Sequence, residues 1–184
     1  MDHGPMSNEE NYHLDVAGFL HVPSVLTPGE VNRLNKAIDT SNETSGFLGL
    51  PEGKREAFRD LLVHPQLVWY LNQIIGPGFK LVRLPEILGS DPSQVDLPLQ
   101  GGNEPLNPGT AYFYKNGRRH FEGVRVIWAL SDVSEGAGGF VLVPHTHRGN
   151  VQVPEDVFTG KDDLGLTRQA SMRVGDLMII GLSV

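Results

Sequence analysis

The sequence predicts an α+β protein in which helices come first and a β-barrel or jelly roll follows. Three observations lead to this class. Helical periodicity, with a well-marked start at Thr27, is confined to the first half of the chain. Short apolar runs separated by turn residues fill the second half. Finally, 22 Gly and 13 Pro among 184 residues favour many turns and short strands over long helices.

The N-terminal residues predict a short lead-in to a single domain. Residues 1–11, MDHGPMSNEEN, are polar and acidic, and we expect them to be disordered. This leaves one domain over 12–184, long enough for one real core and too short for two. The run AGFLHVPSVL over 17–26 predicts a short strand broken at Pro23.

Three helices are expected after this strand. The first has Thr27 as its N-cap, Pro28 at its first position and Glu30 three residues after the cap, which is the pattern of a capping box. A second and a third helix are predicted over 52–62 and 64–75, where the sequence GPG ends the third.

The rest of the chain predicts strands and their connections. Asn116-Gly117 supplies the two positive-φ residues of a type I′ hairpin turn. The Pro- and Gly-rich connection over 90–109 is long enough to be either functional or disordered, and 151–166 is expected to be loop or short helix. The predicted strands are 79–89 (interrupted by Pro85), 110–114, 120–130, 140–143 and 177–184.

Composition excludes several classes of function. A net charge of -7 and a pI near 5.4 argue against nucleic acid as a partner, because phosphate binding needs a basic face. The absence of cysteine excludes disulfides, zinc–thiolate sites and thiol nucleophiles. Neither a signal peptide nor an apolar run of membrane-helix length is found, so a cytoplasmic location without membrane contact is expected.

His145 and His147 form a local pattern of metal-ligating residues. In an extended segment, side chains two residues apart lie on the same side, so the two imidazoles would make half of a site for iron, manganese, nickel or zinc. With Gly139 before them, they also fit the first part of a cupin motif, in which Gln152 stands where the glutamate is usual. The second cupin motif is not found.

Four segments, in this order and spacing, resemble the phytanoyl-CoA dioxygenase family of iron(II)/2-oxoglutarate-dependent oxygenases. They are GFLHVPSVLTPGEV, HPQLVWYLNQIIGPGFKL, VRVIWALSDVSEGAGGFVLVPHTHRGN and MRVGDLMII. The resemblance covers nearly the whole chain from Tyr12 onward. It implies a cupin-like jelly roll (a double-stranded β-helix) with N-terminal helices packed on one sheet. It also implies iron(II) and 2-oxoglutarate as cofactors, and hydroxylation of a small organic substrate.

The sequence departs from this family at the metal ligands. By the resemblance, Gln100 stands in the slot of the first histidine ligand and Gly102 in that of the carboxylate. The distal histidine would fall beyond Val184, so a chain truncated at its C-terminus, without the late strands, is expected. His147 matches a histidine that shapes the barrel rim and is not a ligand. The resemblance therefore implies a degraded metal site in which no metal is bound.

Four residues are candidates for the cosubstrate or substrate pocket. Tyr112, Tyr114 and Arg125 alternate along facing strands and could line the barrel, although a mixed sheet face would give the same pattern. Trp128 lies one position after the tryptophan that the family places against its cosubstrate. A shift of one residue turns a side chain to the opposite face of a sheet, which favours packing for Trp128.

The sequence thus leaves three hypotheses for function. The first is a dioxygenase-family protein acting on a small organic molecule, with a degraded or truncated metal site. The second is a non-catalytic binding module with the same fold, and the third is a cupin-like metal site at His145 and His147. An exposed sheet edge, left by missing strands, further predicts homo-oligomerisation.

Overall fold

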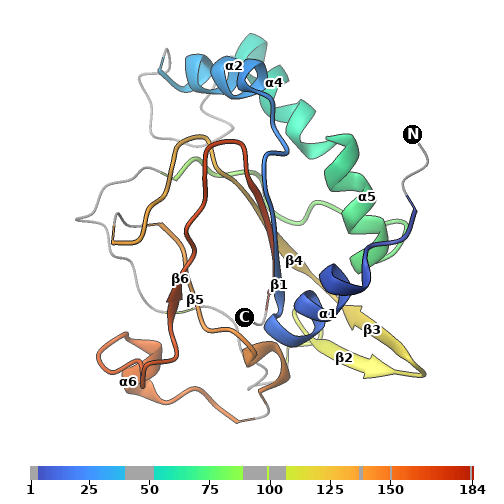
Figure 1. The fold of residues 1–184 in the computed structure, drawn as a ribbon, viewed down its shortest axis with the longest axis vertical. Helices are drawn as coiled ribbons and strands as arrows, with labels where there is room; N and C mark the ends of the chain where they lie inside the picture. The colour runs from blue at the N-terminus through green and yellow to red at the C-terminus, as the bar shows by residue number, and fades with distance from the viewer. Residues whose placement is uncertain are drawn as a thin grey trace.

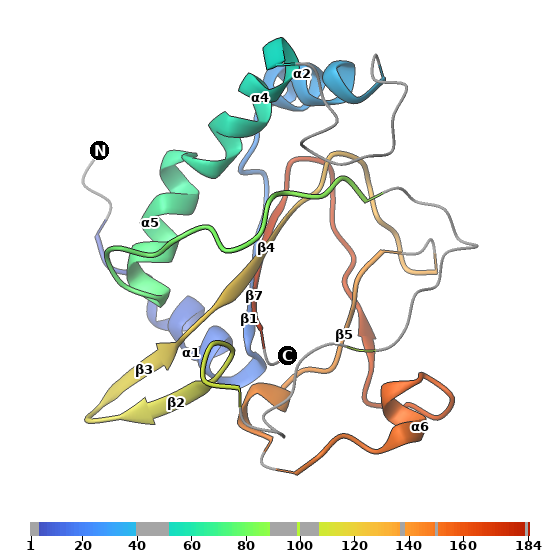
Figure 2. The same cartoon turned by 180° about the vertical axis from the view of Figure 1, so that it is seen from behind.

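The structure is a computed structural model that describes residues 4–39, 52–88, 99, 107–136, 139–149, 151–182 and 184. Its helices are α1 (Asn8–Ala17), α2 (Pro28–Asp39), α4 (Glu52–Leu62), α5 (Pro65–Ile74) and the short α6 (Glu155–Phe158). In Figures 1 and 2, α1, α2, α4 and α5 lie along one side of a central sheet, and α6 lies on the other side beyond two short strands. The predicted α+β class, with helices first, is confirmed.

The central sheet has three antiparallel strands in the order β1 (Phe19–Val22), β7 (Leu177–Gly181) and β4 (Val124–Trp128). Although β7 is the last strand in the sequence, it lies in the middle, and all five of its residues are buried. Within the described residues β1 and β4 are the outer strands of this sheet. Oligomerisation through such an edge stays a prediction.

The two faces of the central sheet contact different layers. Leu20, Ile179 and Val126 lie in one row across the three strands, and they pack into a core that includes α1 and α5. The neighbouring row, Phe19, Ile180 and Arg125, points the other way because side chains alternate along a strand. We call this second side the inner face.

A small second layer covers part of the inner face. It contains β5 (Val141–Leu142) and β6 (Arg168–Gln169), which pair with each other in antiparallel fashion. Met178 and Ile180 of β7 form one apolar cluster with Leu142, Ala170 and Met172 of this layer. Two facing sheets with helices outside one of them agree with the predicted arrangement, while a complete jelly roll remains a prediction.

Strands β2 (Tyr112–Lys115) and β3 (Arg118–Phe121) form a separate hairpin. Its turn residues have the positive φ angles that the sequence predicted, 53° at Asn116 and 73° at Gly117. The hairpin prediction is therefore confirmed. The single strand predicted over 120–130 is wrong, because β3 pairs with β2 whereas β4 pairs with β7. Gly123 lies between β3 and β4, and a Cβ at this position would lie 2.5 Å from the Leu182 side chain.

Two further predictions need correction. Residues 8–11 are not disordered, because they form the first turn of α1, and Met6 before them is buried in the core. The strand predicted over 79–89 is also absent from the described part, since 79–88 forms no strand there. Pro85 removes a backbone donor from this segment, and Leu81, Val82 and Leu84 remain exposed.

The start of α1 explains the first of these corrections. The hydroxyl of Ser7 accepts a hydrogen bond from Glu10 N at 3.1 Å, and the Glu10 carboxylate accepts one from Ser7 N at 2.8 Å. This is a complete capping box, and its S-x-x-E signature is visible in the sequence. Glu10 also accepts a bond of 2.5 Å from the buried Tyr70 hydroxyl of α5, which fixes the helix to the core.

Replacement of Ser7 by alanine tests this start. We expect Ser7→Ala to lower the free energy of unfolding by about 1 kcal/mol. The backbone N–H of Glu10 loses its acceptor, and the Glu10 carboxylate is less well aligned with the backbone N–H of residue 7. The measurement is urea unfolding followed by circular dichroism. Ser131→Ala, at an exposed serine outside any helix, is the matched control. Equal losses in both variants would contradict the capping role.

None of the helices in the described part of the chain is long and apolar enough to cross a membrane.

Candidate functional site

A polar cluster forms where α1, the β2–β3 hairpin and the short 3-10 helix η1 (Thr146–Arg148) meet. The Asp15 carboxylate accepts hydrogen bonds from the Tyr112 hydroxyl of β2 and from the Arg148 guanidinium of η1. The guanidinium also lies over the Tyr112 ring, 5.6 Å from its centroid. One carboxylate on α1 thus holds two elements that are far away in sequence.

The hydrogen bonds set the protonation of this cluster. Burial acts to raise the pKa of Asp15, but the bonds from Tyr112 and Arg148 outweigh it and hold that pKa below its usual range. Burial and the neighbouring carboxylate raise the pKa of the Tyr112 hydroxyl. The cluster is therefore a carboxylate with a neutral phenol and a guanidinium at neutral pH, which suits structural anchoring better than proton transfer.

His145 and His147 both contact the backbone of α1. His145 Nδ1 lies 2.7 Å from Val16 O, and His147 Nε2 lies 2.9 Å from Asp15 O, so each ring donates to a carbonyl. His147 is fully buried, and burial lowers its pKa. Its ring packs edge-on against Tyr112, with centroids 4.7 Å apart.

The extended conformation expected for 145–147 is wrong. His145 has a left-handed backbone, with φ of 74°, and residues 146–148 form η1. The period-two rule that would place both rings on one side applies only to extended chain, so the geometric basis of the paired half-site is lost. This geometry does not support the cupin-like metal site.

No group of three or more metal-ligating side chains is assembled within the residues that the structure describes. The His13-Leu14-Asp15 triplet has the spacing of a ligand pair, but His13 Nδ1 lies 3.0 Å from Phe19 O and Asp15 belongs to the polar cluster. Gln100 and Gly102 lie outside the described residues. The assignment of Gln100, His145 and His147 as metal-site residues therefore stays a prediction.

The structure separates the four residues predicted for the pocket. Tyr112 is held by Asp15, and Tyr114 is 65% exposed on the hairpin. Trp128 faces the helices, with its ring 5.4 Å from that of His64, as its shifted position suggested. Arg125 alone of the four lies on the inner face of the central sheet, where its guanidinium sits 5.9 Å from the centroid of the Phe140 ring.

A second polar pair was not predicted from the sequence. Asp176 is 2% exposed, and its carboxylate accepts bonds from His21 Nε2 at 2.8 Å, Ser24 N at 2.9 Å and Arg173 N at 2.8 Å. Burial acts to raise the pKa of Asp176, but these three bonds outweigh it and lower the pKa. His21 and Asp176 are 155 residues apart, so no local pattern could pair them.

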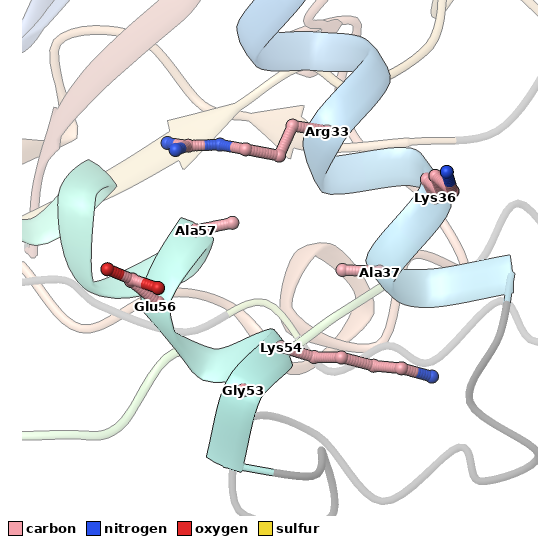
Figure 3. Close-up of a pocket in the computed structure, with 7 residues that line it drawn as sticks. All are labelled: Arg33, Lys36, Ala37, Gly53, Lys54, Glu56 and Ala57. Atoms are coloured by element: carbon pink, nitrogen blue, oxygen red, sulfur yellow. The ribbon is translucent and has the colours of Figure 1, made fainter.

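A cavity of about 260 Å³ lies between α2 and α4 on the helical side of the molecule. Figure 3 shows Ala37 and Ala57 facing each other across it, with the charged side chains extending from its margin. Arg33 at this margin pairs with Asp60 at 2.5 Å. The cavity is formed by the helices alone and contains none of the predicted site residues. Its lining residues are Arg33, Lys36, Ala37, Gly53, Lys54, Glu56 and Ala57.

No family model and no curated protein matches this sequence. Solved structures do match. The crystal structure of HygX from Streptomyces hygroscopicus with nickel and 2-oxoglutarate bound has 20% sequence identity and a TM-score of 0.72, over 97% of this chain and 78% of that chain. The apo form of HygX has 18% identity and a TM-score of 0.76, over 97% and 79%.

The carbocyclase SnoK, described as non-heme and alpha-ketoglutarate dependent and belonging to nogalamycin biosynthesis, matches more distantly. It has 17% identity and a TM-score of 0.56, over 98% of this chain and 78% of that chain. Identities this low establish a shared fold and no more. The chain therefore has the fold of enzymes that use 2-oxoglutarate, as the resemblance implied.

Proposed function

We propose that the protein is a member of the iron(II)/2-oxoglutarate-dependent dioxygenases, in or near the phytanoyl-CoA dioxygenase family, and that it works on a small organic molecule in the cytoplasm. The observation that carries this proposal is the fold shared with HygX over 97% of the chain. Crystal structures of HygX contain iron, or nickel with 2-oxoglutarate, and one also contains hygromycin B. These ligands support the cofactor and substrate classes.

The donor atoms of this chain do not fit the iron site of such an enzyme. The family's site uses two imidazoles and a carboxylate. In the matching slots, Gln100 offers a neutral amide oxygen and Gly102 offers no side chain. The described residues contain no alternative group of three ligands. We therefore propose that the metal site is degraded.

A non-catalytic binding module with this fold is the second candidate. The lack of an assembled ligand group among the described residues favours it over the cupin-like site. Both leading candidates retain a small-molecule ligand, and they differ in whether the chain keeps the place of an iron site that restored ligands would complete. The iron(II) affinity of a variant with restored ligands therefore separates them better than any assay of turnover.

Restoring the two ligand slots tests the degraded site. We expect the wild-type protein to show no visible charge-transfer band with iron(II) and 2-oxoglutarate under nitrogen. The double variant Gln100→His/Gly102→Asp adds an imidazole and a carboxylate, and we expect it to bind iron(II) roughly tenfold or more tightly. Isothermal titration gives the dissociation constants, and absorbance follows the band.

Gln73→His, which places an imidazole on the exposed side of α5, is the control for nonspecific binding. A strong band in the wild type would show that the site is intact and the degradation proposal wrong, while the family proposal would stand. If neither the wild type nor the double variant binds iron(II) or 2-oxoglutarate, the family proposal itself fails.

A further inference from the structure

Residues 79–88, which follow α5, have the apolar composition of a strand but no strand partner. We call this segment the strap. Its two ends are anchored, because Phe79 packs against the core that includes α5 and Ile87 packs against the cluster between α2 and α4. In Figure 2 the strap is the green trace that crosses the front of the molecule. It makes no hydrogen bond or ion pair in the part of the chain that the structure describes.

The even-numbered positions of the strap are all exposed. Val82 is 89% exposed and Leu84 is 48% exposed, and they lie between the exposed Lys80 and Glu86. The half-buried positions are all odd-numbered, as the alternation of side chains along a strand requires. An exposed, strand-like segment whose backbone N–H and C=O groups have no partner is a template for a strand of another chain.

The strap is complementary to a second copy of itself. Two copies that pair in antiparallel fashion about a two-fold axis place residues of the same parity opposite each other. One such register sets Lys80 of each copy opposite Glu86 of the other, and Val82 opposite Leu84. Each pair then joins opposite charges or two apolar side chains, which are combinations that stabilise neighbouring strands. Arg83 and Glu86 differ in parity, so this symmetry cannot place them opposite each other.

The two irregular residues of the strap are compatible with this register. In an antiparallel pair, residues two apart use the same hydrogen-bonding edge. The even-numbered residues therefore bond the second copy, while Pro85, which has no N–H, lies on the other edge. The backbone bends at Arg83, which is where the two-fold axis passes. A bend towards either face of the pair gives both strands the same curve.

We propose that the strap is a homodimerisation strand, which pairs with the strap of a second copy of this chain about a two-fold axis beside Arg83. The contact forms two ion pairs across the strands and covers Val82 and Leu84 of both copies. Two short strands bury less than the ~1,200–2,000 Å² of stable interfaces, so the dimer is weak and its population rises with protein concentration. It uses neither outer strand of the central sheet and does not depend on the proposed function.

Sedimentation velocity over a wide range of protein concentration tests the dimer. We expect the wild type to shift from monomer to dimer as the concentration rises. Val82→Ser should raise the dissociation constant roughly tenfold or more, because each copy loses an apolar contact near the axis. Val151→Ser is the matched control, at a loop valine that is 83% exposed. A wild type that stays monomeric throughout, or a dimer that the two variants affect equally, would overturn the inference.

Charge reversal tests the register. Lys80→Glu and Glu86→Lys each set like charges opposite each other, so each variant alone should dimerise roughly tenfold more weakly than the wild type. An equal mixture of the two should recover the wild-type affinity, because one copy then carries two acids at these positions and the other carries two lysines. Lys115→Glu, at an exposed lysine of the hairpin, is the control and should leave the affinity unchanged. A mixture that dimerises no better than its components would contradict the register.

Arg83 supplies a test of the opposite sign. In this register its side chain lies opposite Arg83 of the second copy, as a like-charge pair on the face away from Lys80 and Glu86. Arg83→Gln should therefore strengthen the dimer roughly twofold to fivefold at low salt. Circular dichroism establishes that every variant is folded. A weaker dimer in Arg83→Gln would show that Arg83 meets an acid, which would contradict pairing of the strap with itself.

Discussion

Asp176→Asn should be among the most destabilising single changes in this protein, lowering the free energy of unfolding by about 3 kcal/mol. The carboxylate is nearly inaccessible and accepts three hydrogen bonds, two of them from the backbone donors of Ser24 and Arg173. An amide of the same shape loses the charge and turns one acceptor into a donor that faces a donor. Urea unfolding at neutral pH measures the loss.

The same site predicts how stability depends on pH. Because the pKa of Asp176 is lower in the folded protein than its ordinary value, its contribution is complete above that ordinary value, about 3.9. The contribution is then lost as the pH falls through the lower, folded value. The wild type should therefore lose stability below about pH 4 more steeply than Asp176→Asn.

Asp162→Asn, at an exposed loop carboxylate that accepts a bond from Leu164 N, is the matched control. It should change the stability by less than about 0.5 kcal/mol and leave the acid limb of the curve as in the wild type. Similar losses for the two asparagine variants would show that Asp176 is not the special group that its geometry indicates.

Gly18→Ala should lower the free energy of unfolding by about 3 kcal/mol or more, for two independent reasons. Gly18 ends α1 with φ of 83°, a region that costs other residues about 1–2 kcal/mol. In addition, a Cβ built there would lie 2.4 Å from His147 Nδ1 and 2.5 Å from a methyl of Val184. Overpacking of this kind typically costs a further 1–3 kcal/mol or so.

Gly78→Ala isolates the first of these reasons. Gly78 has nearly the same φ, 88°, but no atom lies within 4 Å of the place of its Cβ. Gly78→Ala should lower the free energy of unfolding by only about 1 kcal/mol. The difference between the two variants, from thermal or urea unfolding, is then the cost of disturbing the contact between α1 and η1. Equal costs would mean that His147 gives way easily, and that the junction is looser than its burial implies.

Local chemistry explains which elements could be predicted. The capping box at Thr27 and Glu30, present as a bond of 2.8 Å from Thr27 N, marks the start of α2 in the sequence itself. The Asn116-Gly117 turn does the same for the hairpin, because only a few residues tolerate positive φ at both turn positions. Ser7 and Glu10 carry an equally local signal, so the start of α1 could have been predicted as well.

The candidate site could be predicted only in part. The alternation of Arg125 and Trp128 onto opposite faces of β4 follows from strand geometry, since they are three residues apart. Which of those faces meets the helices depends on α5, β7 and the second layer. The extended conformation expected for residues 145–147 was wrong because the chain turns there, at a left-handed residue that is not glycine.

The sequence by itself determined the α+β class, the helices α2, α4 and α5, the hairpin and the resemblance that the shared fold supports. These depend on interactions within a few residues, or on patterns that a long run of sequence preserves. The tertiary structure alone decided that Asp15 joins three elements, that Asp176 pairs with His21, and that Arg125 faces the second sheet. The first two contacts join residues that are distant in the chain, and the third depends on which layer covers each face of the sheet. A local sequence pattern specifies neither the distant partner nor the covering layer.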